Sequence, residues 1–199
     1  MHVRSQRRIT AALIIAGLTL AVAAPALAQD ESPEPDAAVV AADGDLASQL
    51  PAEVRGLPLE PQTFSGSAIL ENADMSDPEQ AQDVADFQAL LDGLGVGLDD
   101  VTLVSASAFD EQGGVLAFGM QVAGSDADSF VEPWALLYSS GEYEDPQLEE
   151  TELGGTPVSS ITDAASDYAP PSYAYASGDV VWLLLGDEAD IIAVLEALP

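Results

Sequence analysis

The chain has 199 residues, of which 48% are hydrophobic, with 35 acidic residues against four Lys and Arg, one His and no Cys. Its formal net charge of −31 predicts a surface that repels nucleic acid and anionic lipid and attracts cations or basic proteins. After residue 28 the chain contains no His, Cys or Lys. Zinc, haem and iron–sulfur sites and the Ser–His and Ser–Lys hydrolases therefore lack essential groups.

Residues 1–28 have the three-part order of a secretory signal peptide. Three arginines within the first eight residues precede an apolar run that Pro25 ends, and a small-residue pattern follows up to Ala28. We expect cleavage before Gln29 and a secreted or extracytoplasmic protein with a formal charge of −34, because three of the four arginines would be removed. An uncleaved membrane anchor stays open, since the apolar run approaches the length of one bilayer span.

Residues 29–55 are rich in acids, alanine and proline, which predicts an acidic disordered linker. The apolar blocks after it predict a single folded domain over 56–199, long enough to bury a core without disulfides. Its first elements are a strand over 63–70 and a helix over 78–92. Pro78 suits the first turn of that helix, and Ser76 lies at capping-box distance from Glu79.

Two strands over 101–109 and 115–122 flank a glycine-containing turn, which predicts an antiparallel hairpin. A second helix is expected from Ser125, and Pro133 must kink or restart it. The acidic residues 141–152 are interpreted as a loop.

A strand through Ile161 and a loop over 163–171 come next in the predicted order. Residues 172–176 and 180–185 predict a second hairpin, whose second strand is apolar enough to be central in a sheet. A helix over 187–198 completes the chain.

These elements predict an α+β fold in which helices pack on one face of an antiparallel sheet. Segments 115–134 and 180–199 each run from a strand through a short acidic cap into a helix, which raises the hypothesis of two hairpin–helix repeats. The alternative is that strand–cap–helix units resemble one another for physical reasons alone.

The stretches GGTPVSSIT (154–162) and SYAYASGDVVWLLL (172–185) resemble uncharacterised exported α+β domain proteins of high-GC bacteria. The resemblance covers 56–199 loosely and 154–199 best. It rests on glycine turns and core strands, so it implies the fold and carries no activity.

We expect no cofactor. Oxygen ligands are the only metal-binding groups in quantity, so calcium is the alternative to consider. Asp126 and Asp128 are the best candidates, although the positions after them do not match an EF-hand loop. Weaker acidic groups are Asp99 with Asp100, and Asp187 with Glu188 and Asp190. The alternative for every group is helix capping, because acids in a first turn complement the helix dipole.

Tyr173 and Tyr175 alternate on one strand and so share a face, with Trp182 on the next strand. If that face is exposed, it is a surface for a sugar or a protein partner. If it is buried, it is where the last helix packs. Tyr168 lies on the approach to this hairpin.

The sequence therefore predicts a secreted, acidic, non-catalytic domain with a role in interaction or ligand binding. A basic protein or cations are the expected partners, with no nucleic acid and, after signal cleavage, no membrane. Two alternatives stay open, a protein that binds calcium or another hard cation and a carboxylate-dependent hydrolase.

Overall fold

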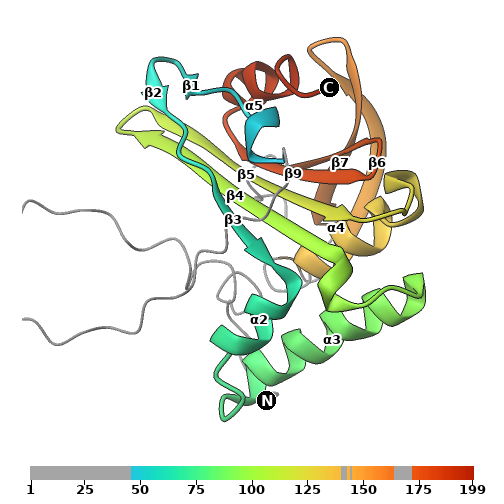
Figure 1. Cartoon of the computed structure of the whole chain (residues 1–199). Coiled ribbons are helices and arrows are strands. Elements are labelled where there is room, and N and C mark those ends of the chain that lie inside the picture. The colour runs from blue at the N-terminus through green and yellow to red at the C-terminus, as the bar shows by residue number, and fades with distance from the viewer. Residues whose placement is uncertain (1–45, 140–142, 144, 164–171) are drawn as a thin grey trace, which may run out of the picture.

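The structure, a computed structural model, describes residues 46–139, 143, 145–163 and 172–199 (Figure 1). Its strands are β1 (Glu53–Val54), β2 (Leu57–Pro58), β3 (Gln62–Ser65), β4 (Val101–Asp110), β5 (Gly113–Val122), β6 (Pro146–Leu153), β7 (Thr156–Asp163), β8 (Ser172–Ser177) and β9 (Val180–Gly186). Its α-helices are α2 (Gly66–Asn72), α3 (Pro78–Leu94), α4 (Val131–Ser139) and α5 (Glu188–Leu195). Single 3-10 turns are η1 (Ala47–Gln49), η2 (Leu98–Asp100) and η3 (Ala127–Ser129).

Seven strands form one sheet in the order β3-β4-β5-β9-β8-β7-β6, and every neighbouring pair is antiparallel. β1 and β2 form a separate small hairpin. The predicted α+β class with an antiparallel sheet is confirmed. The two predicted hairpins, β4–β5 and β8–β9, are present, and β9 is central, between β5 and β8.

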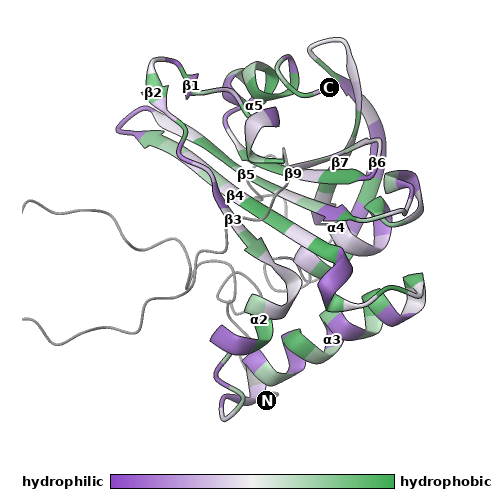
Figure 2. Ribbon diagram, viewed as in Figure 1, coloured by the Kyte–Doolittle hydropathy of each residue, from purple (hydrophilic) through white to green (hydrophobic). Residues whose placement is uncertain are grey.

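Both faces of the sheet are buried, each by different helices (Figures 1 and 2). Trp182 and Leu184 of β9 join the core beneath α5, which we call the α5-side core. Val181 and Leu183 point the other way into the core beneath α2, α3 and α4, the α4-side core. The prediction that the helices pack on one face is therefore wrong. Because β9 is apolar at consecutive positions, both of its faces must be covered.

The hypothesis of two hairpin–helix repeats does not fit this arrangement. Val115 and Val180, the first residues of the two compared segments, both face the α5-side core. Equivalent residues of β5 and β9 therefore point to the same face of the sheet. The helices that follow them lie on opposite faces, α4 on one and α5 on the other. A rotation that superposed the two hairpins would place both helices on the same face. The likeness of the two segments is therefore that of strand–cap–helix units in general.

The folded domain begins earlier than predicted. Leu46, Leu50 and Val54 are buried in the α5-side core, although they lie in the range predicted as a linker. These apolar residues recur every fourth position, and the acids, alanines and prolines before them conceal that spacing. The predicted signal peptide and the remainder of the predicted linker lie outside the described residues.

Three local predictions also need correction. The strand predicted over 63–70 ends at Ser65, whose hydroxyl accepts a hydrogen bond from the Ala68 backbone N–H and caps α2. Residues 146–152, predicted as part of an acidic loop, belong to the edge strand β6, which pairs with β7 along its whole length. Its acids suit an edge, because exposed charges oppose pairing with a further chain.

The helix predicted over 78–92 is confirmed as α3, which extends to Leu94. Its apolar stripe is buried in the α4-side core, and the Phe87 ring lies 6.0 Å from that of Trp134 in α4. The Ser76 hydroxyl, one half of the predicted capping box, donates a hydrogen bond to Asp74 Oδ1 at 2.6 Å. Pro133 stands in the first turn of α4, so the second predicted helix does restart, after η3.

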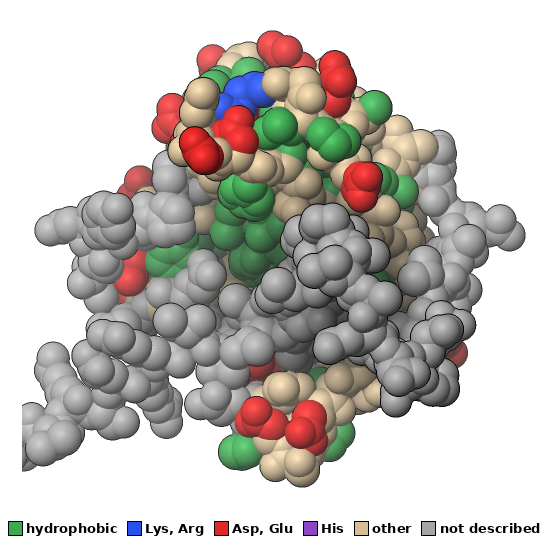
Figure 3. Space-filling model, turned by 90° about the vertical axis from the view of Figure 1, so that its left-hand side faces the viewer, with side chains coloured by type: hydrophobic (Ala, Val, Ile, Leu, Met, Phe, Trp, Pro, Cys, Tyr) green, Lys and Arg blue, Asp and Glu red, His purple; other side chains and the backbone are tan. Residues whose placement is uncertain are grey.

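Arg55 is the only Lys or Arg among the described residues, and Figure 3 shows it surrounded by acidic side chains. Arg55 and Gly56 have φ values of 52° and 77°, as in a type I′ turn, and join β1 to β2. The Arg55 Nε lies 2.7 Å from Asp190 Oδ1 in α5, and its Nη2 lies 3.7 Å from Asp110 Oδ1. Asp190 is 1% exposed. The N-terminal hairpin thus brings a cation to a buried carboxylate.

Candidate ligand-binding groove

β7 and β8 separate after a short paired segment. Their register contains only three pairs, Ser159 with Ala174, Ser160 with Tyr173 and Ile161 with Ser172. β7 nevertheless begins at Thr156, and β8 continues to Ser177. Beyond the last pair the two strands form the sides of a fork.

Two features coincide with this fork: the β6–β7 turn packs against α5, and Pro157 has no N–H to donate to β8. Leu153 and Val158 are buried in the α5-side core, and the turn between the two strands lies against α5. A Cβ at Gly154 would lie only 2.8 Å from Ile192 Cγ2, so the contact needs a residue without a side chain. β8 stays paired with β9 up to Ser177. The start of β7 therefore packs toward α5, whereas the end of β8 stays paired within the sheet.

A cavity of about 730 Å³ lies in the fork, and we call it the β7–β8 groove. Residues 157–159 of β7, 174–176 of β8, Glu150 and Thr151 of β6, and Asp128 and Val131 beside α4 line it. Consecutive strand residues point to opposite faces of a sheet. A cavity lined by three consecutive residues of each strand therefore reaches between the strands. Its volume lies within the range of small-ligand sites, about 300 to 1,000 Å³.

The α4 side of the groove is acidic. Asp128 and Glu150 are both exposed there. The one described cation, Arg55, is paired with Asp110 and Asp190, so within the described residues neither groove carboxylate has a Lys or Arg partner. Val131, Ala174 and Ala176 supply apolar surface beside the two carboxylates. The groove thus presents negative charge next to small apolar side chains.

Asp126 and Asp128, the predicted metal ligands, have different roles in the structure. Asp126 caps η3 by accepting a hydrogen bond from the Asp128 backbone N–H at 3.3 Å. Asp128 lines the groove. Both side chains are exposed, and among the described residues no group of three or more His, Cys, Asp or Glu is placed to hold a metal ion. The capping alternative is therefore the arrangement found at Asp126.

Three carboxylates of the other acidic groups have partners within the protein. Asp100 accepts from the Gly97 backbone N–H at 2.9 Å, and Asp187 accepts from that of Gly114 at 3.0 Å. The Asp187 contact ties the start of α5 to the β4–β5 turn. Asp190 is the carboxylate paired with Arg55.

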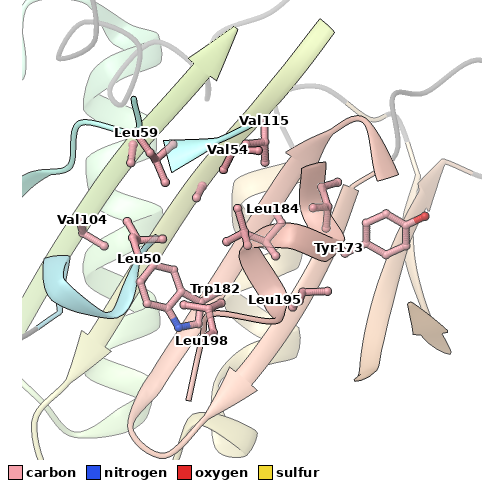
Figure 4. Close-up of a cluster of buried hydrophobic side chains, with 14 of the residues drawn as sticks. Leu50, Val54, Leu59, Val104, Val115, Tyr173, Trp182, Leu184, Leu195 and Leu198 are labelled. Carbon is pink, nitrogen blue, oxygen red and sulfur yellow. The ribbon is translucent and has the colours of Figure 1, made fainter. Parts of the chain in front are cut away.

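The aromatic face of the second hairpin is buried rather than open. Trp182 is fully buried in the α5-side core and Tyr173 is 8% exposed. Figure 4 shows Trp182 beside Leu195 and Leu198, with Tyr173 at the margin of the cluster. Tyr173 and Tyr175 share this face, as predicted. The last helix packs here, so Tyr173 and Trp182 offer no aromatic platform, whereas Tyr175 is half-buried and also lines the β7–β8 groove. Tyr168 lies outside the described residues.

Two tyrosine hydroxyls at this face have partners in the C-terminal segment. The Tyr175 hydroxyl donates to the Pro199 carbonyl oxygen at 2.9 Å, and the Ser177 hydroxyl donates to the same oxygen at 2.8 Å. The Tyr173 hydroxyl donates to Glu188 Oε1 at 3.1 Å. Burial, followed by this hydrogen bond and the charge of Glu188, raises the pKa of Tyr173 above its usual value.

The sequence indicated some of the groove residues but not the groove. The sequence marks Asp128 as a candidate metal ligand and Tyr175 as part of a candidate ligand surface, whereas it predicts a loop at Glu150. Apolar and polar residues alternate from Pro146 to Glu149, as in a half-buried strand. The acidic residues that follow obscure this strand pattern. The parting of β7 and β8 coincides with packing against α5, which no local pattern reports.

Comparison with protein family models, with curated proteins and with solved structures finds no match to this chain. Among the described residues, no helix has the length and apolar character needed to cross a membrane.

Proposed function

We propose that this protein is an exported, non-catalytic domain that binds a cationic ligand in the β7–β8 groove. The observation that carries the proposal is a cavity between two separated strands whose α4 side holds Asp128 and Glu150, with no cationic partner among the described residues. The net charge of −31 would also concentrate cationic ligands near the surface. Export rests on the residue pattern of the first 28 positions.

Binding fits the groove better than catalysis does. Hydrolysis by paired carboxylates requires one of them in an apolar, water-excluded environment. Asp128 and Glu150 are both exposed to water. The remaining polar groups of the groove are the hydroxyls of Thr151, Ser159 and Tyr175, and the sequence supplies no His or Lys after residue 28 to activate them.

Calorimetric titration with spermine in 0.15 M sodium chloride tests the proposal. The Asp128→Asn/Glu150→Gln double variant removes both groove carboxylates. The Asp99→Asn/Glu111→Gln double variant is the matched control, because it changes the charge equally at exposed positions outside the groove. We expect about tenfold weaker spermine binding for the groove variant, because it loses at least one charge-assisted contact. The affinity of the control should change less than twofold. Equal weakening of both variants would show that spermine responds only to net charge and would refute the proposal.

A further inference from the structure

We propose that the occupant of the β7–β8 groove is an extended polypeptide segment bearing Lys or Arg, which adds a strand between β7 and β8. This inference rests on the function proposed above and names the class of ligand. Its starting point is the backbone of the fork. β7 and β8 continue beyond their last pair, and the described residues supply no strand between them.

Backbone N–H and C=O groups in a strand require partners, and an edge without them is a template for pairing with another chain. Two-residue turns close the two hairpins at Leu153–Thr156 and Ser177–Val180, so residues 156 and 158 direct their backbone groups to β6, and residues 175 and 177 direct theirs to β9. The backbone groups left facing the cavity are the Pro157 C=O on β7 and the Ala176 N–H and C=O on β8. A strand between them would donate a hydrogen bond to Pro157 on one side and exchange hydrogen bonds with Ala176 on the other. Because β7 and β8 are antiparallel, it would run antiparallel to one and parallel to the other.

The two sides of the groove differ in chemistry, which sets the pattern of the segment. Glu150 pairs with Ser159, and both lie on the α4 side together with Asp128. Thr151 pairs with Val158 and lies on the α5 side. Alternate side chains of an inserted strand would reach opposite sides. Lys or Arg at alternate positions would meet the two carboxylates, and small apolar side chains between them would meet Val158.

Charge indicates that the segment comes from another protein. Residues 29–45, the part of the predicted linker outside the described residues, contain six acids and no Lys or Arg. A segment from there would place like charges beside Asp128 and Glu150. A second copy of the folded domain has only Arg55 to offer, and that side chain already pairs with Asp190. Arg4, Arg7 and Arg8 belong to the predicted signal peptide, which the exported protein proposed above no longer carries. The complementary partner is therefore a basic segment of a different protein.

The test uses the purified full chain and the peptide acetyl-Lys-Val-Lys-Val-Lys-amide in 0.15 M sodium chloride. Two versions of the peptide carry N-methyl groups either on the first, third and fifth residues or on the second and fourth, so that each lacks the donors of one edge. Calorimetry should give about tenfold weaker binding for each methylated peptide, because each loses backbone hydrogen bonds to one side of the fork. Spermine serves as the cation without a peptide backbone.

Amide hydrogen exchange gives a second measurement that needs no protein variant. The unmodified peptide should slow exchange at Ala176 of β8, whose N–H faces the cavity, whereas spermine should not. Equal affinity of the methylated and unmodified peptides, or unchanged exchange at Ala176, would overturn strand addition. If spermine still distinguished the groove variant from its control, the proposed cation-binding function would stand without it. If neither probe distinguished those variants, both proposals would fail.

Discussion

Replacement of Arg55 by Asn tests the pairing of the one described cation with the buried carboxylate of Asp190. Asn followed by Gly is favoured in type I′ turns, so Arg55→Asn keeps the β1–β2 turn and removes the charge. Breaking a buried ion pair by removing one partner costs about 3 to 5 kcal/mol. The Arg55 side chain is 34% exposed, which places the loss near 3 kcal/mol. Relief of the left-handed backbone at Arg55 returns up to about 1 kcal/mol, so the net loss should be about 2 kcal/mol.

Urea unfolding in 0.15 M sodium chloride measures this loss, with Asp190→Asn made in both the parent and the Arg55→Asn background. Asp190→Asn should be much less harmful after Arg55 is removed, because it then eliminates a buried unpaired charge, and we expect a coupling energy above about 1 kcal/mol. Asp110→Asn is the control and should cost under about 0.5 kcal/mol, since that carboxylate is 36% exposed and 3.7 Å from Arg55. A loss below about 0.5 kcal/mol for Arg55→Asn, or equal effects of Asp190→Asn in both backgrounds, would refute the reasoning.

Four further outcomes are expected. Phe87→Ala should cost about 3 to 5 kcal/mol in urea unfolding, because the side chain is 5% exposed, and a loss under about 1 kcal/mol would contradict its packing. Gly119→Ala should cost about 1 to 3 kcal/mol, since the new Cβ would lie 2.7 Å from Cζ3 of Trp182. Its control, Gly93→Ala in α3, meets no atom within 4 Å and should instead stabilise by about 0.5 to 1 kcal/mol. The raised pKa of Tyr173 means that the folded protein keeps a proton that the unfolded chain loses near pH 10, so stability should fall as the pH rises through this range. Tyr173→Phe should make the fall between pH 9 and 11 shallower, and an unchanged slope would exclude this group. Finally, thermal unfolding should show a higher Tm in 0.15 M than in 0.01 M sodium chloride, because the Debye length falls from about 30 Å to about 8 Å. No salt response would show that repulsion among the acids does not limit stability.

The elements with strong hydrophobic periodicity could be predicted from the sequence. α3, β4–β5 and β8–β9 each combine an apolar pattern with turn or cap residues, and they are found close to the predicted positions. The central position of β9 followed from its continuous apolar run. These features are local, so no knowledge of the partner elements was needed to recognise them.

The features that were missed depend on contacts between distant segments. β6 is a strand because it pairs with β7, although its composition is that of an exposed loop. The segment from Leu46 to Val54 belongs to the domain because α5 gives its three apolar residues a surface to cover. Residues 66–72 form α2 because the Ser65 hydroxyl supplies a cap where the strand pattern continues. Tertiary context decides each of these positions over local preference.

The position of α5 explains the loss of the predicted aromatic site and is linked to the groove. α5 covers the face that carries Tyr173 and Trp182, so these rings become core. The same helix contacts the β6–β7 turn at Gly154, and the start of β7, which follows this turn, is not paired with β8. The binding surface is therefore expected in the backbone and carboxylates of the fork, where Tyr175 is the one member of the predicted aromatic surface that lines the groove.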